Sequence, residues 1–223
     1  MSEERIRIDV DGKRRASVIC TAPEGGDAKM TFLYAPGAGS NLHDPFGRFC
    51  CRELAARGIT PVRIQFPYME EKRKAPDRTP VLEATWRAAI ATFHADGHKL
   101  VVGGRSMGGR IASHVVAQGE HLDALTLFAY PLHAPAKPDN WRDEHLPSIA
   151  IPTLFCSGTR DAFARPDELR SIAAKMKRAS VYELAGADHG YAVLASSGRK
   201  REDVWREAVD VTLAWLKKER LLA

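Results

Sequence analysis

Gly104-Arg105-Ser106-Met107-Gly108 is the stretch of sequence that decides the fold. It lies between an apolar run that ends in Val101-Val102 and a segment with helical periodicity that begins near Met107. A tight strand-to-helix turn exposes a serine for attack, and it needs glycine on both sides because the helix passes close to the strand. The pattern therefore predicts a nucleophile elbow with Ser106 at its tip.

The composition is that of an ordinary globular protein. The chain has 223 residues, of which 44% are hydrophobic and 27% charged. This predicts a single domain over residues 1–223 with one substantial core. The first residues, Met1 to Arg5, are mostly polar, unlike a signal peptide or a membrane-spanning helix, so we expect a cytoplasmic protein with no membrane partner.

The cysteines and the basic clusters both have ordinary interpretations. No Cys-x-x-Cys spacing occurs, which favours reduced thiols over a metal or disulfide framework. The formal net charge of +5 suggests nucleic acid as a partner, but the basic clusters lie apart and no aromatic residues interleave with them for base stacking. We therefore expect a solvated surface and no nucleic-acid partner. The cysteines are Cys20, Cys50, Cys51 and Cys156, and the clusters are Lys13-Arg14-Arg15, Lys72-Arg73-Lys74, Arg199-Lys200-Arg201 and Lys217-Lys218.

The hydrophobic pattern predicts an α/β protein. Apolar and polar residues alternate on both sides of Asp11-Gly12, which indicates an antiparallel hairpin closed by a primed turn at the edge of the sheet. Short apolar strands then alternate with helical segments, which predicts a mostly parallel sheet with helices on both faces. Strands are expected near residues 30–35, 60–64, 100–103, 124–129, 153–156 and 181–184, and helices near 46–57, 81–95, 108–118, 166–177 and 203–218.

Two loop-like segments, residues 67–80 and 131–149, follow the carboxyl ends of expected strands. Both are rich in proline, and neither is long enough to form a separate cap domain. Open α/β sheets bind their ligands at this edge, so either segment is expected to border a pocket.

A serine on such an elbow needs a base and an acid, and in this architecture the acid precedes the histidine along the chain. Asp161 follows one expected strand directly, and His189 follows the next. Each has a plain structural interpretation, Asp161 as a helix cap and His189 as a turn residue. Their order and placement nevertheless favour a Ser106–His189–Asp161 triad. Asp188 is an alternative acid, but a residue adjacent to the histidine is poorly placed to reach the Nδ1 atom of the same ring.

The turn Pro36-Gly37-Ala38-Gly39 supplies a candidate oxyanion hole. It follows the strand expected at residues 30–35, where the amide of Ala38 can point at a developing oxyanion, with the amide of Met107 as the second donor. A plain structural turn is the alternative. Phosphate binding is disfavoured because neither glycine cluster completes a dinucleotide or P-loop motif.

Several residues beyond these strand ends are candidate substrate contacts, although ordinary loop packing is an equal alternative for them. They are Tyr68, Met69, Tyr130, Leu132, His133, Phe163 and His43. His94 and His98 have the spacing of a metal pair on a helix, but Gly97 is expected to end that helix between them, so we predict no metal site.

Four segments together resemble the α/β-hydrolase superfamily, and the resemblance covers nearly the whole chain. They are APGAG (35–39), GGRSMGGR (103–110), GTRDAF (158–163) and ADHGY (187–191). Two further segments, RIQFPYM (63–69) and YPLHAP (130–135), look like the compact hydrolases related to dienelactone hydrolase and to testis-expressed protein 30. The resemblance implies an α/β-hydrolase fold with no cap domain. It also implies that Ser106 is the nucleophile, Asp161 the acid and His189 the base, with the oxyanion hole at Ala38 and Met107. Pro36 departs from the pattern, since many relatives have histidine at this position. The departure concerns how the turn 36–39 is held in place, and it leaves the backbone donors of the oxyanion hole unaffected.

The sequence thus predicts a serine hydrolase that cleaves a small ester, thioester or related acyl bond through an acyl-enzyme. The partner would be a small-molecule acyl substrate, with no cofactor. Short acyl groups are expected, because the loops are too short to form a lid. Two alternatives stay open: a non-catalytic binding or scaffold protein on the same fold, and an acyltransferase that uses an acceptor other than water. No oligomeric state is predicted.

Overall fold

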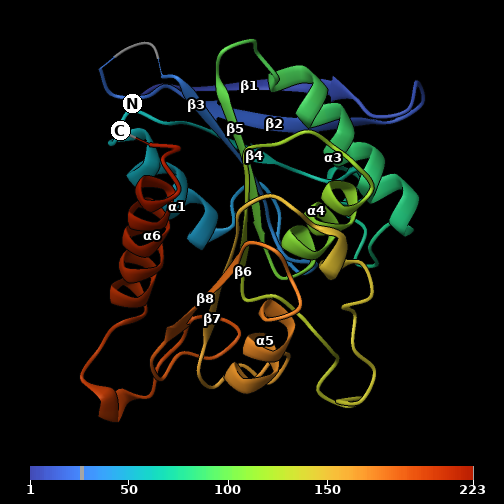
Figure 1. The fold of residues 1–223 in the computed structure, drawn as a ribbon. Helices are drawn as coiled ribbons and strands as arrows, with labels where there is room; N and C mark the ends of the chain where they lie inside the picture. The colour runs from blue at the N-terminus through green and yellow to red at the C-terminus, as the bar shows by residue number, and fades with distance from the viewer. Residues whose placement is uncertain (26–27, 223) are drawn as a thin grey trace.

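A computed structural model describes residues 1–25 and 28–222, and within them the strands form one eight-stranded sheet in the order β1-β2-β4-β3-β5-β6-β7-β8 (Figure 1). The β1–β2 and β2–β4 pairs are antiparallel, and all the other neighbouring pairs are parallel. The predicted fold class, a mostly parallel sheet with an N-terminal hairpin, is confirmed. The strands are β1 Glu3–Asp9, β2 Arg15–Thr21, β3 Met30–Ala35, β4 Thr60–Ile64, β5 Lys99–Arg105, β6 Ala124–Phe128, β7 Thr153–Gly158 and β8 Ala179–Leu184.

Helices cover both faces of the sheet (Figure 1). Apolar side chains of α3, α4 and α5 join the core on one face, and those of α1 and α6 join the core on the other. The short helix α2 lies in the segment between β4 and α3. The helices are α1 Pro45–Ala55, α2 Pro67–Glu70, α3 Thr79–Phe93, α4 Met107–Ala117, α5 Pro166–Ala173 and α6 Arg201–Lys218.

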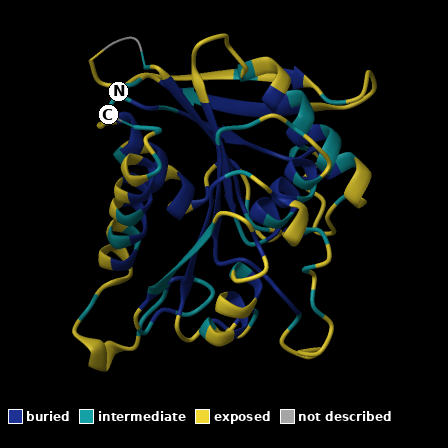
Figure 2. Cartoon of the chain, viewed as in Figure 1, coloured by how far each residue is buried: buried dark blue, intermediate teal, exposed yellow. Residues whose placement is uncertain are grey.

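The central strands are buried on both faces, as the dark colour of the sheet in Figure 2 shows. Successive residues alternate between the two cores: Leu33 and Val102 face α3, α4 and α5, whereas Phe32 and Val101 face α1 and α6. A parallel strand covered on both sides needs apolar residues at every position. This burial explains why these segments appear in the sequence as unbroken apolar runs.

The hairpin differs from its prediction in the turn. Val10 N–H donates to the Arg14 carbonyl at 2.9 Å, which leaves a three-residue loop rather than a two-residue primed turn. The Asp11 carboxylate accepts the Arg14 amide at 2.8 Å, and Gly12 takes a positive φ of 74°. The Asp11 side chain thus stabilises the longer loop by local hydrogen bonds.

Two elements also differ in extent. The segment 67–80, expected as a loop, contains α2, and the helix expected over 166–177 ends at Ala173. Pro67 at the first helical position favours the short helix. Within the described residues, no helix is long and apolar enough to cross a membrane.

The topology brings the candidate residues to one edge of the sheet. Because β3, β5, β7 and β8 run parallel to one another, their carboxyl ends lie on the same side. β5 lies between β3 and β6, so the loop that follows it is central. The loops after β3, β7 and β8 converge on this point.

Candidate active site

Ser106 occupies a strained turn between β5 and α4. Its backbone φ of 51° and ψ of −120° lie outside the regions that ordinary residues prefer. Two hydrogen bonds hold it there: Ser106 N–H donates to the Phe128 carbonyl at 2.9 Å, and the Ser106 carbonyl accepts the Arg110 amide at 3.0 Å. Hydrogen bonds to β6 and to the first turn of α4 thus stabilise the strained backbone conformation of Ser106.

The glycines around Ser106 are required by close backbone contacts. A Cβ atom on Gly108 would lie 2.2 Å from the Ala35 carbonyl oxygen, and one on Gly104 would lie 2.6 Å from the Gly108 carbonyl carbon. Both distances are much shorter than van der Waals contact. Both nearest atoms belong to the backbone, so no side-chain rotation can relieve the clash. The packing confirms that β3, β5 and α4 approach as closely as an elbow requires.

Ser106, His189 and Asp161 form one hydrogen-bonded chain. The Ser106 Oγ atom lies 2.9 Å from His189 Nε2, and His189 Nδ1 lies 2.9 Å from Asp161 Oδ2. Because a carboxylate can only accept, Nδ1 carries the proton that faces Asp161, and Nε2 is left to accept the Ser106 hydroxyl proton. The Asp161 side chain is fully buried, whereas His189 keeps 21% of its side-chain surface exposed. The arrangement is that of a nucleophile, a base and an orienting acid.

One residue, Phe163, contacts both Asp161 and His189. The Phe163 amide donates to Asp161 Oδ1 at 2.8 Å, and the Phe163 ring stacks on the His189 ring with centroids 4.1 Å apart. Asp188, the alternative acid, instead accepts the amides of Gly190 and Ala192 at 2.8 and 2.9 Å. Its carboxylate therefore shapes the histidine loop rather than binding the ring.

Arg105 joins the histidine loop to the start of α1. Its guanidinium donates to the His189 carbonyl oxygen at 3.1 Å and lies 3.7 Å from the buried carboxylate of Asp44. Asp44 in turn accepts the Tyr34 hydroxyl at 2.6 Å and the Ser40 hydroxyl at 3.2 Å. One buried carboxylate thus connects the segment after β3 with the loop after β8.

The turn after β3 lies directly against the serine. A Cβ atom on Gly37 would be 3.4 Å from Ser106 Cβ. Met107 is the first residue of α4, and its amide has no acceptor within the helix, so it adds to the positive end of the helix dipole. Met107 directly follows Ser106, and Ala38 follows Gly37, which lies against the serine.

Tyr68 supports this turn from α2. Its hydroxyl donates to the Ala38 carbonyl at 2.8 Å. Burial, with a smaller contribution from Asp77, raises the pKa of Tyr68 to about 12, so the phenol keeps its proton and remains a donor. The bond fixes the peptide that follows the Ala38 amide. Tyr68 is thus a support for the candidate oxyanion hole.

We expect Tyr68→Phe to lower kcat by up to about tenfold with little change in KM, because one hydrogen bond contributes about 0.5–1.5 kcal/mol. The loss falls on kcat since the turn is positioned for the transition state rather than for the bound substrate. Steady-state kinetics on an activated ester measures the split. A rise in KM at constant kcat would instead show that Tyr68 only binds the substrate.

A hollow of about 340 Å³ opens beside this turn. Lys72 and Lys74 line it, as does Arg73, whose guanidinium is bound by Asp77 at 2.5 Å and by Glu71 at 2.6 Å. Its other lining residues are Ala38, Gly39, Ser40, Asn41, Tyr68 and Met69. Two of the candidate substrate contacts, Tyr68 and Met69, therefore border a space beside the candidate oxyanion turn.

Phe163, stacked on the His189 ring, is a third candidate contact at the site, whereas the remaining four lie elsewhere. Tyr130 and Leu132 are fully buried in the core, and His133 bonds the buried carboxylate of Glu168 at 3.0 Å. These three side chains hold the segment 131–149 in place behind the site. His43 lies outside the hollow, in a separate cavity beside α1.

Arg105 and Asp44 are parts of the site that the sequence interpretation missed. Arg105 occupies the variable position of the elbow motif, which carries no signal of its own. Asp44 had one usable signal, since an aspartate directly before proline at a helix start is a strong capping pattern. Its carboxylate accepts the Gly47 amide at 2.8 Å.

A second serine–histidine pair connects α4 with the segment 131–149. Ser113 Oγ is 2.7 Å from His145 Nε2, but Ser113 is fully buried. Burial, with smaller contributions from His114 and Arg110, lowers the pKa of His145 to about 4, so the ring is neutral near pH 7. The pair fastens the segment 131–149 to α4 and is closed to substrate. No group of three or more potential metal ligands occurs among residues 1–25 and 28–222.

A mostly parallel sheet with a serine elbow at the end of a central strand defines the α/β-hydrolase class. A sequence profile of the alpha/beta hydrolase domain matches residues 28–217. The chain therefore belongs to the alpha/beta hydrolase family, as the sequence resemblance implied.

Solved structures share this fold across nearly the whole chain. Est1E from Butyrivibrio proteoclasticus is 13% identical, with 96% of this chain and 99% of that chain covered and a TM-score of 0.75. XC6422 from Xanthomonas campestris, described as a serine hydrolase without a lid, is 17% identical, with 98% of this chain and 95% of that chain covered and a TM-score of 0.75. Dienelactone hydrolase from Anabaena variabilis is 21% identical, with 97% of each chain covered and a TM-score of 0.73. The cap-less fold agrees with its prediction.

Proposed function

We propose that this protein is a serine hydrolase that cleaves small esters, thioesters or related acyl bonds through an acyl-enzyme. The observation that carries the proposal is the continuous chain from Ser106 Oγ to His189 Nε2, and from His189 Nδ1 to Asp161, with 2.9 Å at each step. Membership of the alpha/beta hydrolase family supports it.

In the proposed mechanism each group has one role. Ser106 Oγ attacks the acyl carbon while its proton passes to His189 Nε2, and Asp161 stabilises the imidazolium that forms. The amides of Ala38 and Met107 bind the oxyanion. When the intermediate collapses, the leaving alcohol or thiol takes the proton from His189, and the acyl group stays on Ser106. Water, deprotonated by the same histidine, then releases the acid.

The size of the hollow beside the candidate oxyanion turn supports a short acyl group. The hollow beside the oxyanion turn is about 340 Å³, at the lower end of the range of about 300–1,000 Å³ typical of ligand pockets. No cap domain covers it in the described residues, 1–25 and 28–222. Because Lys72 and Lys74 line the hollow, acyl donors that carry a carboxylate belong in the substrate panel.

The test is direct detection of the acyl-enzyme. With p-nitrophenyl acetate in excess, we expect a burst of nitrophenol close to one equivalent of protein, followed by slower turnover. Acid quenching and peptide mass spectrometry should then find the acetyl group on Ser106. Butyrate esters should react as well as acetate esters, and palmitate esters should react poorly.

The two alternatives give different results in the same experiment. A non-catalytic binding protein would show neither a burst nor labelling of Ser106 by a fluorophosphonate while remaining folded. An acyltransferase would acylate Ser106, but an added alcohol or amine would then accelerate deacylation and appear as an acylated product.

A further inference from the structure

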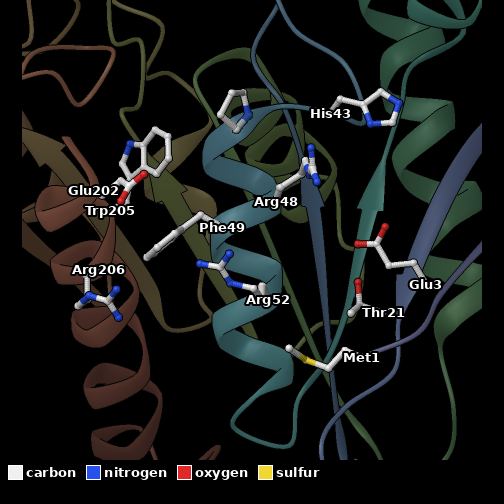
Figure 3. A pocket seen from close by; sticks show the side chains of 11 residues that line it. Met1, Glu3, Thr21, His43, Arg48, Phe49, Arg52, Glu202, Trp205 and Arg206 are labelled. Atoms are coloured by element: carbon white, nitrogen blue, oxygen red, sulfur yellow. The ribbon is translucent and has the colours of Figure 1, made fainter. Parts of the chain in front are cut away.

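We propose that a second cavity, separate from the hollow beside the candidate oxyanion turn and independent of the proposed hydrolase activity, binds a small organic phosphate. This α1–α6 cavity has a volume of about 570 Å³, well within the size range of ligand pockets. It lies between α1, the start of α6 and the paired ends of β1 and β2 (Figure 3). Its lining residues are Met1, Glu3, Thr21, His43, Pro45, Arg48, Phe49, Arg52, Glu202, Trp205 and Arg206.

Three arginines line this cavity from two helices. Arg48 and Arg52 are one helical turn apart on α1, and Arg206 faces them from α6 (Figure 3). Guanidinium groups bind phosphate through two parallel hydrogen bonds and are less strongly hydrated than ammonium groups. Cations on opposite walls suit a ligand with several phosphate oxygens.

The carboxylates nearby do not neutralise these arginines. Glu53 faces two of the lining arginines, Arg52 at 3.5 Å and Arg206 at 3.6 Å. Its third partner, Arg57 at 3.1 Å, lies outside the lining and is also bound by Asp210 at 3.4 Å. Arg48 has no carboxylate within 4.0 Å among the residues described. Arg52 and Arg206 thus share the single negative charge of Glu53, which leaves the wall of the cavity with a surplus of positive charge.

The negative residues of the lining do not reverse this sign. Glu3 is held by the buried guanidinium of Arg63 at 2.5 Å, so its charge is already paired. Glu202 is the remaining lining carboxylate, against Arg48, Arg52 and Arg206. The cavity therefore favours an anion over a cation.

The aromatic ring of Phe49 contacts two of the lining arginines. The guanidinium carbons of Arg52 and Arg206 lie 5.2 and 5.6 Å from the centre of the Phe49 ring. Trp205 packs beside this ring, with centroids 5.7 Å apart. These cation–π contacts orient the guanidinium groups before any ligand arrives, which reduces the ordering cost of binding.

Two buried donors in the lining have no partner in the part of the chain described. Thr21 is 4% exposed, and its hydroxyl has no hydrogen bond; the buried indole N–H of Trp205 has none either. Buried polar groups of this kind are ordinarily hydrogen-bonded. Both atoms are closed to solvent in this structure, so a ligand oxygen would reach them only after a local rearrangement of the lining.

Calorimetric titration with sodium pyrophosphate and with ADP tests the site, at ionic strength held constant with sodium chloride. We expect both to bind the wild type, and Arg48→Gln to weaken binding about tenfold or more, since a charge-assisted hydrogen bond contributes that much. The affinity of Arg48→Lys should lie between those of the wild type and Arg48→Gln. Arg15→Gln is the matched control: it removes the same charge from the far end of β2, and binding should stay within about twofold of the wild type.

Intrinsic fluorescence supplies a second readout. ADP should change the tryptophan emission of the wild type but not that of Trp205→Phe. The proposal is overturned if pyrophosphate binds no more tightly than sulfate, or if Arg48→Gln and Arg15→Gln weaken binding equally, because either result means attraction to the net positive charge alone. Both arginines are exposed, so neither variant should change the melting temperature.

Discussion

Ser106→Ala should lower kcat by about 10⁶-fold and abolish fluorophosphonate labelling, and His189→Ala should do the same. The two side chains act as one unit through the 2.9 Å contact between Ser106 Oγ and His189 Nε2, so the double variant should be no worse than either single variant. Asp161→Asn should lower kcat by about 10⁴-fold, because it removes the carboxylate that sets the tautomer of His189.

Ser113→Ala is the matched control for the serine. Ser113 also contacts a histidine, with Oγ 2.7 Å from His145 Nε2, and it lies on the same helix that begins at the elbow. Because it is fully buried, its loss should leave kcat within a few-fold of the wild type. If Ser113→Ala lost labelling while Ser106→Ala kept it, the assignment of the nucleophile would be wrong.

Gly108→Ala is expected to destabilise the fold by about 3 kcal/mol, the upper end for overpacking. The new methyl group would lie 2.2 Å from the Ala35 carbonyl oxygen and 2.6 Å from the Pro36 oxygen, both of them backbone atoms. At about 2–4 °C per kcal/mol for a chain of this length, Tm should fall by about 10 °C. Calorimetry measures it, and the displaced elbow should also reduce kcat.

Gly39→Ala separates the effect of crowding from that of losing a glycine. A Cβ atom on Gly39 meets no other atom within 4 Å, and its φ is not in the left-handed region. Its melting temperature should therefore be unchanged or slightly higher, because alanine reduces the entropy of the unfolded chain. Equal losses of Tm at Gly39 and Gly108 would refute the close contact between α4 and β3.

The fold could be predicted because its signals are local. Each buried strand is an apolar run bounded by turn residues, and the elbow glycines follow from the contact between β3 and α4. Ser106, Asp161 and His189 each follow an expected strand, which predicted that they lie at the same edge of a parallel sheet. The structure brings the three side chains together at that edge. Their catalytic roles stay a prediction, as do those of Ala38 and Met107.

Other parts of the site depend on contacts between distant segments. Nothing near Tyr130 or His133 in the sequence indicates that their side chains turn into the core. His43 follows the oxyanion turn closely, yet the start of α1 carries it to a different cavity. The contact from Arg105 to the His189 carbonyl spans 84 positions in the chain, beyond the reach of any local pattern.

The shared carboxylate of Asp44 has a consequence for the timing of turnover. Through Ser40 and Arg105 it ties together the segment that bears the oxyanion turn and the loop that bears His189. Enzymes whose sites assemble on binding are often limited by the opening and closing of loops. We therefore expect the proposed reacting groups to keep their relative positions in the empty protein, so that turnover is limited by the chemical steps or by product release rather than by loop closure.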